Sequence, residues 1–216
     1  MKKMDKKRIV ISTLACMLPM LLGIIMYSRL PEQLPTHWNA QGEIDRYSSK
    51  KFALFGLPFI VVGVNILCQL VMESDPKKKN YTGKLQSIVI WMLPVLSLMI
   101  QIITIVAGLG LELDVTAIVS LFVGVIFVAL GNYLPKCKQN YTIGYKLPWT
   151  LDDEENWNKT HRLAGWLMVL SGILVIITVP LQLMFPAMIV VLVISLVPAV
   201  YSYVLYVRKR KEDMTA

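Results

Sequence analysis

The two histidines of the chain and the carboxylates near them are the residues that could form a catalytic or metal site. His37 is followed by Glu43 and Asp45, and His161 comes shortly after four consecutive acids, Asp152–Glu155. A metal site needs three or four ligands in a fixed geometry, and nothing in the sequence holds the groups around His37 in place. No nucleophile is paired with a base near either histidine. The sequence therefore predicts no metal, no cofactor and no catalytic residue.

The elements that must position these residues are predicted from composition. Of the 216 residues, 56% are apolar and 17% are charged, whereas a soluble domain has about 45–50% apolar and about 25% charged residues. A membrane-spanning helix needs about 20 mostly apolar residues. Six runs of that length contain no Lys, Arg, Asp or Glu: Ile9–Tyr27, Phe52–Met72, Leu85–Leu111, Val115–Tyr133, Leu163–Leu183 and Ala187–Tyr206.

Each of these runs is expected to be a helix, because lipid offers no hydrogen-bond partners to backbone groups. The predicted fold class is all-α, a polytopic membrane protein of about six transmembrane helices. With six spans, 18 of the 22 Lys and Arg lie on one side of the membrane, in both termini and in the loops 73–84 and 134–162. The positive-inside rule places that side in the cytoplasm. We expect a multi-pass plasma membrane protein with both ends inside.

This topology also accounts for the net charge of +8. Basic residues at helix ends are typical anchors for membrane lipids, so they do not indicate a nucleic-acid surface. The topology places His37 outside and His161 inside, where they cannot form one catalytic site. We therefore expect a protein that is not an enzyme.

Polar groups within the spans are amides rather than charges. Ion-coupled transporters usually place ionisable groups in the membrane, and none is present here. The amides are expected to join helices by hydrogen bonds, and three glycine pairs spaced seven apart are expected to let helices approach closely. The amides are Asn65, Gln69, Gln86, Gln101 and Gln182, and the pairs are Gly56/Gly63, Gly124/Gly131 and Gly165/Gly172.

The segment between the first two spans is too patterned to be a plain connector. Pro31 and Pro35 restrict the backbone conformation at the start of the segment, and residues 40–42 (Ala-Gln-Gly) predict a turn. The pattern is consistent with a folded interfacial loop that places Trp38 and Tyr47 at headgroup level. A loop that binds a partner is an equally good interpretation, since loops on rigid scaffolds often carry function.

The segment between the fourth and fifth spans is also patterned. Thr150, followed three residues later by Asp153, predicts a capping box with Thr150 as N-cap. Trp157 and His161 are four residues apart and would share a helix face. The pattern indicates a short amphipathic cytoplasmic helix that runs into the fifth span, with Trp149 just before its cap.

Both segments resemble known sequences, and the resemblance covers nearly the whole chain. The outer Leu-Pro-Thr-His-Trp-Asn-Ala-x-Gly at 34–42 resembles an N-terminal membrane domain of unknown function that often precedes an SdpI module. The inner segment resembles the SdpI family, the immunity proteins against the sporulation-delaying peptide toxin. This second resemblance rests on Gly131, Asn132, Pro135, Asn140, Gly144, Pro148, Trp149, Thr150, Trp157, Thr160, His161 and Arg162. The cytoplasmic motif also includes Lys146, which departs from the family pattern. At position 146 the family usually has Arg, whose bidentate fork Lys cannot reproduce.

The resemblance implies a two-domain organisation and a function. Residues 1–84 would form a two-helix membrane domain with an outer loop at 28–51, and residues 85–216 an SdpI-like four-helix domain with the cytoplasmic loop 134–162. The protein would protect its cell from a secreted membrane-active peptide toxin. A further role that the resemblance implies is the sequestration of a cytoplasmic transcriptional repressor. The toxin-facing candidates are Pro35, Thr36, His37, Trp38, Asn39, Gly42 and Asp45. The alternative is a peptide or lipid transporter or flippase without an ATPase motif; a third class is a membrane enzyme or an accessory subunit.

Overall fold

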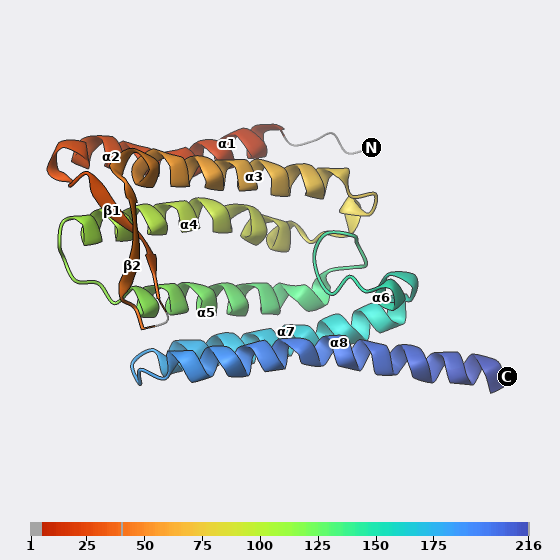
Figure 1. The fold of residues 1–216 in the computed structure, drawn as a ribbon. Helices are drawn as coiled ribbons and strands as arrows, with labels where there is room; N and C mark the ends of the chain where they lie inside the picture. Colours follow the sequence, from red (N-terminus) through yellow and green to blue (C-terminus); the bar gives the residue numbers. More distant parts are fainter. Residues whose placement is uncertain (1–5, 40, 216) are drawn as a thin grey trace. The chain divides into compact units, whose positions relative to one another are not determined.

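A computed structural model describes residues 6–39 and 41–215, apart from the side chains of residues 6 and 184–186. Within these residues six helices are long and apolar enough to cross a membrane, which confirms the predicted fold class (Figure 1). The α-helices of these residues are α1 (Lys6–Met17), α2 (Pro19–Met26), α3 (Leu57–Ser74), α4 (Gly83–Gly108), α5 (Val115–Tyr133), α6 (Pro148–Asp152), α7 (Glu154–Thr178) and α8 (Met184–Thr215). Helices α1 and α2 together form the first span, and the short α6 is not a span. Which side of the membrane holds the termini stays a prediction.

Proline residues explain how the spans differ from the apolar runs. The first span is made of two helices, because Pro19 starts α2 and cannot donate a backbone hydrogen bond to the preceding turn. The fifth run was predicted to end at Leu183, but α7 ends at Thr178, two residues before Pro180. Gln182 therefore lies beyond the helix, with φ at +55°, and the prediction that it joins helices within a span is wrong.

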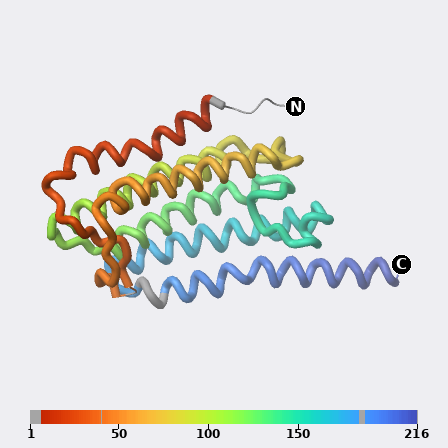
Figure 2. The backbone as a smooth tube through the Cα atoms, turned by 45° about the horizontal axis from the view of Figure 1, so that its top comes forward, coloured from red at the N-terminus to blue at the C-terminus, as the bar shows by residue number. Residues whose placement is uncertain are grey.

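A β-hairpin occupies the segment that was expected to be a loop (Figures 1 and 2). Strands β1 (Gln33–Trp38) and β2 (Ile44–Ser49) pair antiparallel, with Leu34 opposite Ser48 and Trp38 opposite Ile44. The sequence did not predict these strands because β2 is mostly polar and lacks the alternation of apolar residues that identifies a strand. We call residues 33–49 the hairpin.

The chain divides into two compact units. Unit 1 combines Met1–Glu73 with Val89–Ile118 and contains the hairpin, whereas unit 2 combines Ser74–Ile88 with Val119–Ala216. Helices α4 and α5 each contribute to both units. The division into sequence domains at residue 84 stays a prediction.

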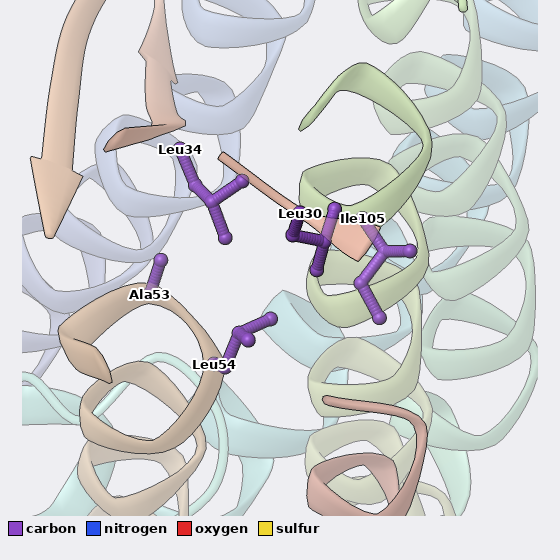
Figure 3. Close-up of a cluster of buried hydrophobic side chains, with 5 residues drawn as sticks. All are labelled: Leu30, Leu34, Ala53, Leu54 and Ile105. Carbon is purple, nitrogen blue, oxygen red and sulfur yellow. The ribbon is translucent and has the colours of Figure 1, made fainter. Parts of the chain in front are cut away.

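Of the buried apolar clusters in unit 1, one includes the start of the hairpin. Leu30, just before β1, and Leu34, in β1, pack with Ala53, Leu54 and Ile105 (Figure 3). Residues 52–56 (η2) form one π-helical turn between β2 and α3. The hairpin is thus continuous with a packed apolar cluster and is not a free connector.

Buried amides join the helices of unit 1, as predicted for three of them. The Gln69 amide of α3 donates to the Ser12 hydroxyl of α1 over 2.8 Å, and Asn65 donates to the Ile90 carbonyl of α4 over 3.4 Å. The Gln101 amide donates to the Leu54 carbonyl over 3.4 Å. Such bonds contribute on average only about 0.6 kcal/mol each within a bilayer.

Glycines bring α5 and α7 of unit 2 together, as predicted for two of the three pairs. A Cβ atom added at Gly131 would lie 2.7 Å from the Gly165 carbonyl oxygen, and one at Gly124 would lie 3.0 Å from that of Gly172. Any larger residue would push the helices apart. The prediction for the third pair is wrong, because a Cβ at Gly63 would meet nothing within 4 Å.

Candidate functional sites: the hairpin and the motif segment

An exposed histidine–aspartate pair joins the two strands of the hairpin. His37 Nδ1 lies 2.6 Å from Asp45 Oδ1, and the two side chains are 56% and 42% exposed. Two hydroxyls, of Thr36 and Ser48, lie 2.9 Å apart across the same strands. The sequence placed His37 and Asp45 close together but could not pair them, because that depends on strand register.

The turn of the hairpin is organised by Asn39. Its side-chain oxygen accepts hydrogen bonds from the backbone N–H of Gln41 and Glu43, over 3.0 and 2.9 Å. Its amide donates to the Glu43 carboxylate over 3.0 Å. Gly42 has φ at +82°, which favours glycine, and a Cβ there would meet the Thr116 hydroxyl. Both residues therefore shape the turn.

The base of the hairpin is held by a buried lysine. Lys50 follows β2, and its ammonium donates to the Leu30 carbonyl over 2.9 Å and pairs with Glu32 at 3.0 Å. The Tyr27 ring lies 4.5 Å from the same ammonium. The Lys50 side chain is only 7% exposed, so its charge is compensated by these contacts. Sequence reasoning missed Lys50, because nothing distinguishes it from the exposed Lys51 beside it.

In unit 2 the motif segment, residues 131–162, is organised around His161. The imidazole stacks on the Trp157 indole with ring centroids 3.8 Å apart, and both side chains are fully buried. Nε2 accepts the backbone N–H of Tyr145 over 3.0 Å, and Nδ1 lies 2.8 Å from the Trp157 carbonyl. Since a backbone N–H can only donate, Nε2 carries no proton and Nδ1–H donates. His161 is therefore a neutral structural residue with both nitrogens occupied.

Gly144 is required by this arrangement. Its φ of +115° disfavours other residues, and an added Cβ would overlap His161 Nε2. The predicted sharing of a face by Trp157 and His161 is confirmed. The Trp157 indole N–H also donates to the Cys137 carbonyl over 2.8 Å, which joins α7 to the end of η4 (Leu134–Lys136).

The predicted capping box at Thr150 is wrong. Helix α6 starts earlier, with Leu147 as N-cap and Pro148 in the first turn, so Thr150 is its third residue. The Thr150 hydroxyl accepts the Leu147 N–H over 3.0 Å and donates to the Tyr145 carbonyl over 2.6 Å. Asp153 is the N-cap of α7 and accepts the N–H groups of the second and third helical residues. The five-residue helix α6 and a separate start of the long helix α7 at Asp153 replace the single helix start expected at Thr150.

The start of α7 is fastened to α8. The Asn156 amide accepts from the Thr160 hydroxyl over 3.0 Å and donates to the Ser202 carbonyl over 2.9 Å. The Trp149 indole donates to the Ser202 hydroxyl over 2.9 Å, and its ring stacks against Tyr206. Trp149 thus packs against α8.

A buried carboxylate closes the loop between η4 and α6. Asp75 Oδ2 accepts the Tyr141 N–H and the Thr142 hydroxyl, each over 2.9 Å, and the Tyr81 hydroxyl over 2.5 Å. Burial alone would raise the pKa of Asp75, but its hydrogen bonds outweigh burial and hold the pKa below its usual range. Within the loop, Asn140 accepts the N–H groups of Thr142 and Ile143. Sequence reasoning missed Asp75, because two of its partners, Tyr141 and Thr142, lie more than sixty residues away.

The remaining members of the motif are exposed. They are Asn132, Pro135, Lys146, Pro148 and Arg162. Two of the four acids have basic partners, since Asp153 pairs with Lys209 at 2.9 Å and Glu155 with Lys159 at 2.7 Å. Asp152 and Glu154 are exposed. The buried half of the motif builds the loop, and the exposed half forms its surface.

Comparison with known families matches both segments. Residues 136–202 match the SdpI/YfhL protein family, and residues 14–62 match a domain of unknown function, DUF1648. The resemblance to the SdpI family is confirmed. The chain is similar to the protein named Immunity protein SdpI of Bacillus subtilis (strain 168), with 29% identity over 170 residues, which are 78% of this chain and 80% of that protein. No solved structure matches the chain.

The family matches and the six apolar helices indicate the same cellular location for the protein. The chain is a multi-pass protein of the plasma membrane, as predicted. The SdpI region begins at the end of η4 and runs into α8, so it includes the buried contacts of His161 and Trp157 and those of Ser202. The DUF1648 region includes the whole hairpin.

Proposed function

We propose that this chain is a membrane immunity protein that protects its own cell from a secreted membrane-active peptide toxin, and that it does so by binding, without catalysis. The observation that carries the proposal is the similarity to Immunity protein SdpI over 78% of the chain, a span long enough to take in both patterned segments. The occupied nitrogens of His161 support a mechanism without a general base in the motif segment.

In this proposal the hairpin faces the toxin. His37 and Asp45 present exposed polar groups, and Ile44 and Tyr47 present exposed apolar surface on β2, 38% and 54% exposed. A membrane-active peptide has both kinds of surface, so a hairpin with both is a suitable partner. The Lys50 contacts hold this surface in one orientation, which lowers the entropy lost on binding.

The test is protection of a toxin-sensitive strain. Replacing His37, Trp38 and Asn39 together by Ala should lower the toxin concentration that the cells survive, at unchanged membrane abundance of the protein. Glu112→Ala is the matched control, since Glu112 is exposed in the loop predicted on the same side of the membrane. Full protection by the triple variant at normal abundance would contradict the role of the hairpin.

We also propose that the exposed acids of the motif segment bind a basic cytoplasmic partner, such as a transcriptional repressor. Of the four acids, Asp152 and Glu154 are the better candidates for binding this partner, because they are exposed. Asp153 and Glu155 already form ion pairs within the chain. Asp152→Asn with Glu154→Gln should abolish recruitment of the repressor to membranes and leave protection intact. The control, Glu212→Gln with Asp213→Asn, removes two exposed acids from the end of α8. Equal recruitment by both variants would contradict the docking role.

A further inference from the structure

Two lysines from distant parts of the chain converge on one tyrosine ring in unit 2. The ammonium of Lys84, in the first turn of α4, lies 5.8 Å from the Tyr133 ring centroid. The ammonium of Lys136, at the end of η4, lies 5.1 Å from the same centroid. An aromatic face attracts cations, but it neutralises no charge.

Both charges are left without a counter-ion by the part of the chain that the structure describes. Lys84 and Lys136 are exposed, and no carboxylate forms an ion pair with either of them within residues 6–39 and 41–215. Asp75 of the same unit is occupied by hydrogen bonds from Tyr81, Tyr141 and Thr142. Two like charges at one ring repel each other, and an anion between them would turn this repulsion into attraction.

The position of the pair indicates which anion. Lys84 is the second residue of the spanning helix Gly83–Gly108, and Lys136 is the last of the spanning segment Val115–Lys136. Their ammonium groups therefore lie where the apolar spans end, at the depth of lipid headgroups. Tyr133, with its apolar ring and polar hydroxyl, is a residue type enriched at this interface. Exposed Leu121 and Val125, which precede Tyr133 in α5, offer apolar surface to acyl chains.

We propose that Lys84, Lys136 and Tyr133 form a binding site for the phosphate group of an anionic phospholipid. The two ammonium groups bind the phosphate oxygens, and the Tyr133 ring holds the lysine side chains over the headgroup. This site is distinct from the hairpin and from the exposed acids, and it does not depend on the proposed immunity function.

The size of the effect follows from the charges. Each Lys near an anionic headgroup contributes about 1 kcal/mol, so loss of both should weaken binding about 30-fold, with 1.4 kcal/mol for each factor of ten. The probe is phosphatidylglycerol titrated onto the full-length protein in a neutral detergent, with bound lipid counted by native mass spectrometry. Phosphatidylcholine and inorganic phosphate are titrated in parallel.

Matched variants separate a site from general attraction. The double variant Lys84→Gln with Lys136→Gln should bind phosphatidylglycerol about 30-fold more weakly. The control is Lys79→Gln with Lys138→Gln, which removes two exposed lysines that do not contact Tyr133. This control should change the phosphatidylglycerol affinity less than about 3-fold. Lys84→Arg with Lys136→Arg keeps the charges and should keep binding. Tyr133→Leu should weaken binding while Tyr133→Phe does not.

Three outcomes would overturn the proposal. Equal weakening by the two Gln pairs would mean diffuse attraction to the basic surface. Displacement of the lipid by an equal concentration of inorganic phosphate would mean a site for a soluble anion. Loss of phosphatidylglycerol binding in the variant Lys84→Arg with Lys136→Arg, at an unchanged thermal unfolding midpoint of the protein, would mean that positive charge at these positions is not what binds the lipid.

Discussion

The two histidines of this chain occupy opposite environments. The His37 side chain is more than half exposed on the hairpin and pairs with Asp45, whereas His161 is fully buried and both of its nitrogens are hydrogen-bonded to the backbone. Both belong to the sequence patterns that resemble the family. Residues of the two patterns therefore differ in role, because the buried His161 maintains the inner loop and the exposed His37 is available to a partner.

The largest expected effect comes from removing the buried histidine. His161→Ala would leave a cavity beside Trp157 and two unsatisfied backbone groups, which together cost about 3–5 kcal/mol. We expect a strong loss of membrane abundance and a lower thermal midpoint in detergent. His37→Ala should change neither, although it should weaken protection. Equal destabilisation by both substitutions would remove the distinction between the two regions.

The next effect tests whether the exposed region depends on a buried anchor. Lys50→Met would leave the Leu30 carbonyl without its buried donor and should lower the local opening free energy of the hairpin by about 1.5–3 kcal/mol. Proteolytic cleavage within residues 33–49 should then become about 10–100 times faster, while unit 2 stays intact. Lys51→Met is the control, because Lys51 is exposed. Unchanged cleavage in Lys50→Met would show that the apolar cluster alone holds the hairpin.

A smaller effect is expected at Asp75. Asp75→Asn removes the second carboxylate oxygen as a charged acceptor and should destabilise the loop by about 1–2 kcal/mol, measured by hydrogen exchange of the Tyr141 N–H. The folded-state pKa of Asp75 lies below the unfolded value of 3.8, so its contribution is present above that pH and is lost as the pH falls through the folded pKa. The difference between the wild type and Asp75→Asn should therefore shrink on acidification below about pH 4. A constant difference down to pH 2 would contradict the role of the carboxylate charge.

The smallest effects distinguish the two helix starts in the motif segment. Asp153→Ala removes the N-cap of α7 and should cost about 1 kcal/mol, while Asp153→Asn should be tolerated. Thr150→Ser keeps the hydroxyl that joins Leu147 to Tyr145, and Thr150→Val removes it. We expect the Val variant to unfold at lower temperature than the Ser variant. If Thr150→Val has the stability of the wild type, the hydroxyl does not hold α6.

Prediction from sequence succeeded where the signal is local. Trp157 and His161 share a face because four residues make about one helical turn. The glycine spacing on α5 and on α7 predicted that each helix approaches a neighbour closely, although not which neighbour. It failed at Thr150, because the same residues fit two cap positions and Pro148 selected the earlier helix start. Prediction also failed at the hairpin, because β2 is mostly polar, its partner strand β1 contains Pro35, and β2 shows no alternation of apolar and polar residues.

By itself the sequence determined six spans and the resemblance to a membrane immunity family, because charges in lipid are so costly that spanning helices must be apolar along their whole length. Only the tertiary structure decided which polar residues are buried and with what partners. Lys50 and Lys51 are neighbours of one type, yet only Lys50 is enclosed by Leu30, Glu32 and Tyr27. Asp75 likewise acquires its role from residues far along the chain. Burial and hydrogen bonding depend on segments that meet only in the folded chain, so composition and spacing cannot specify them.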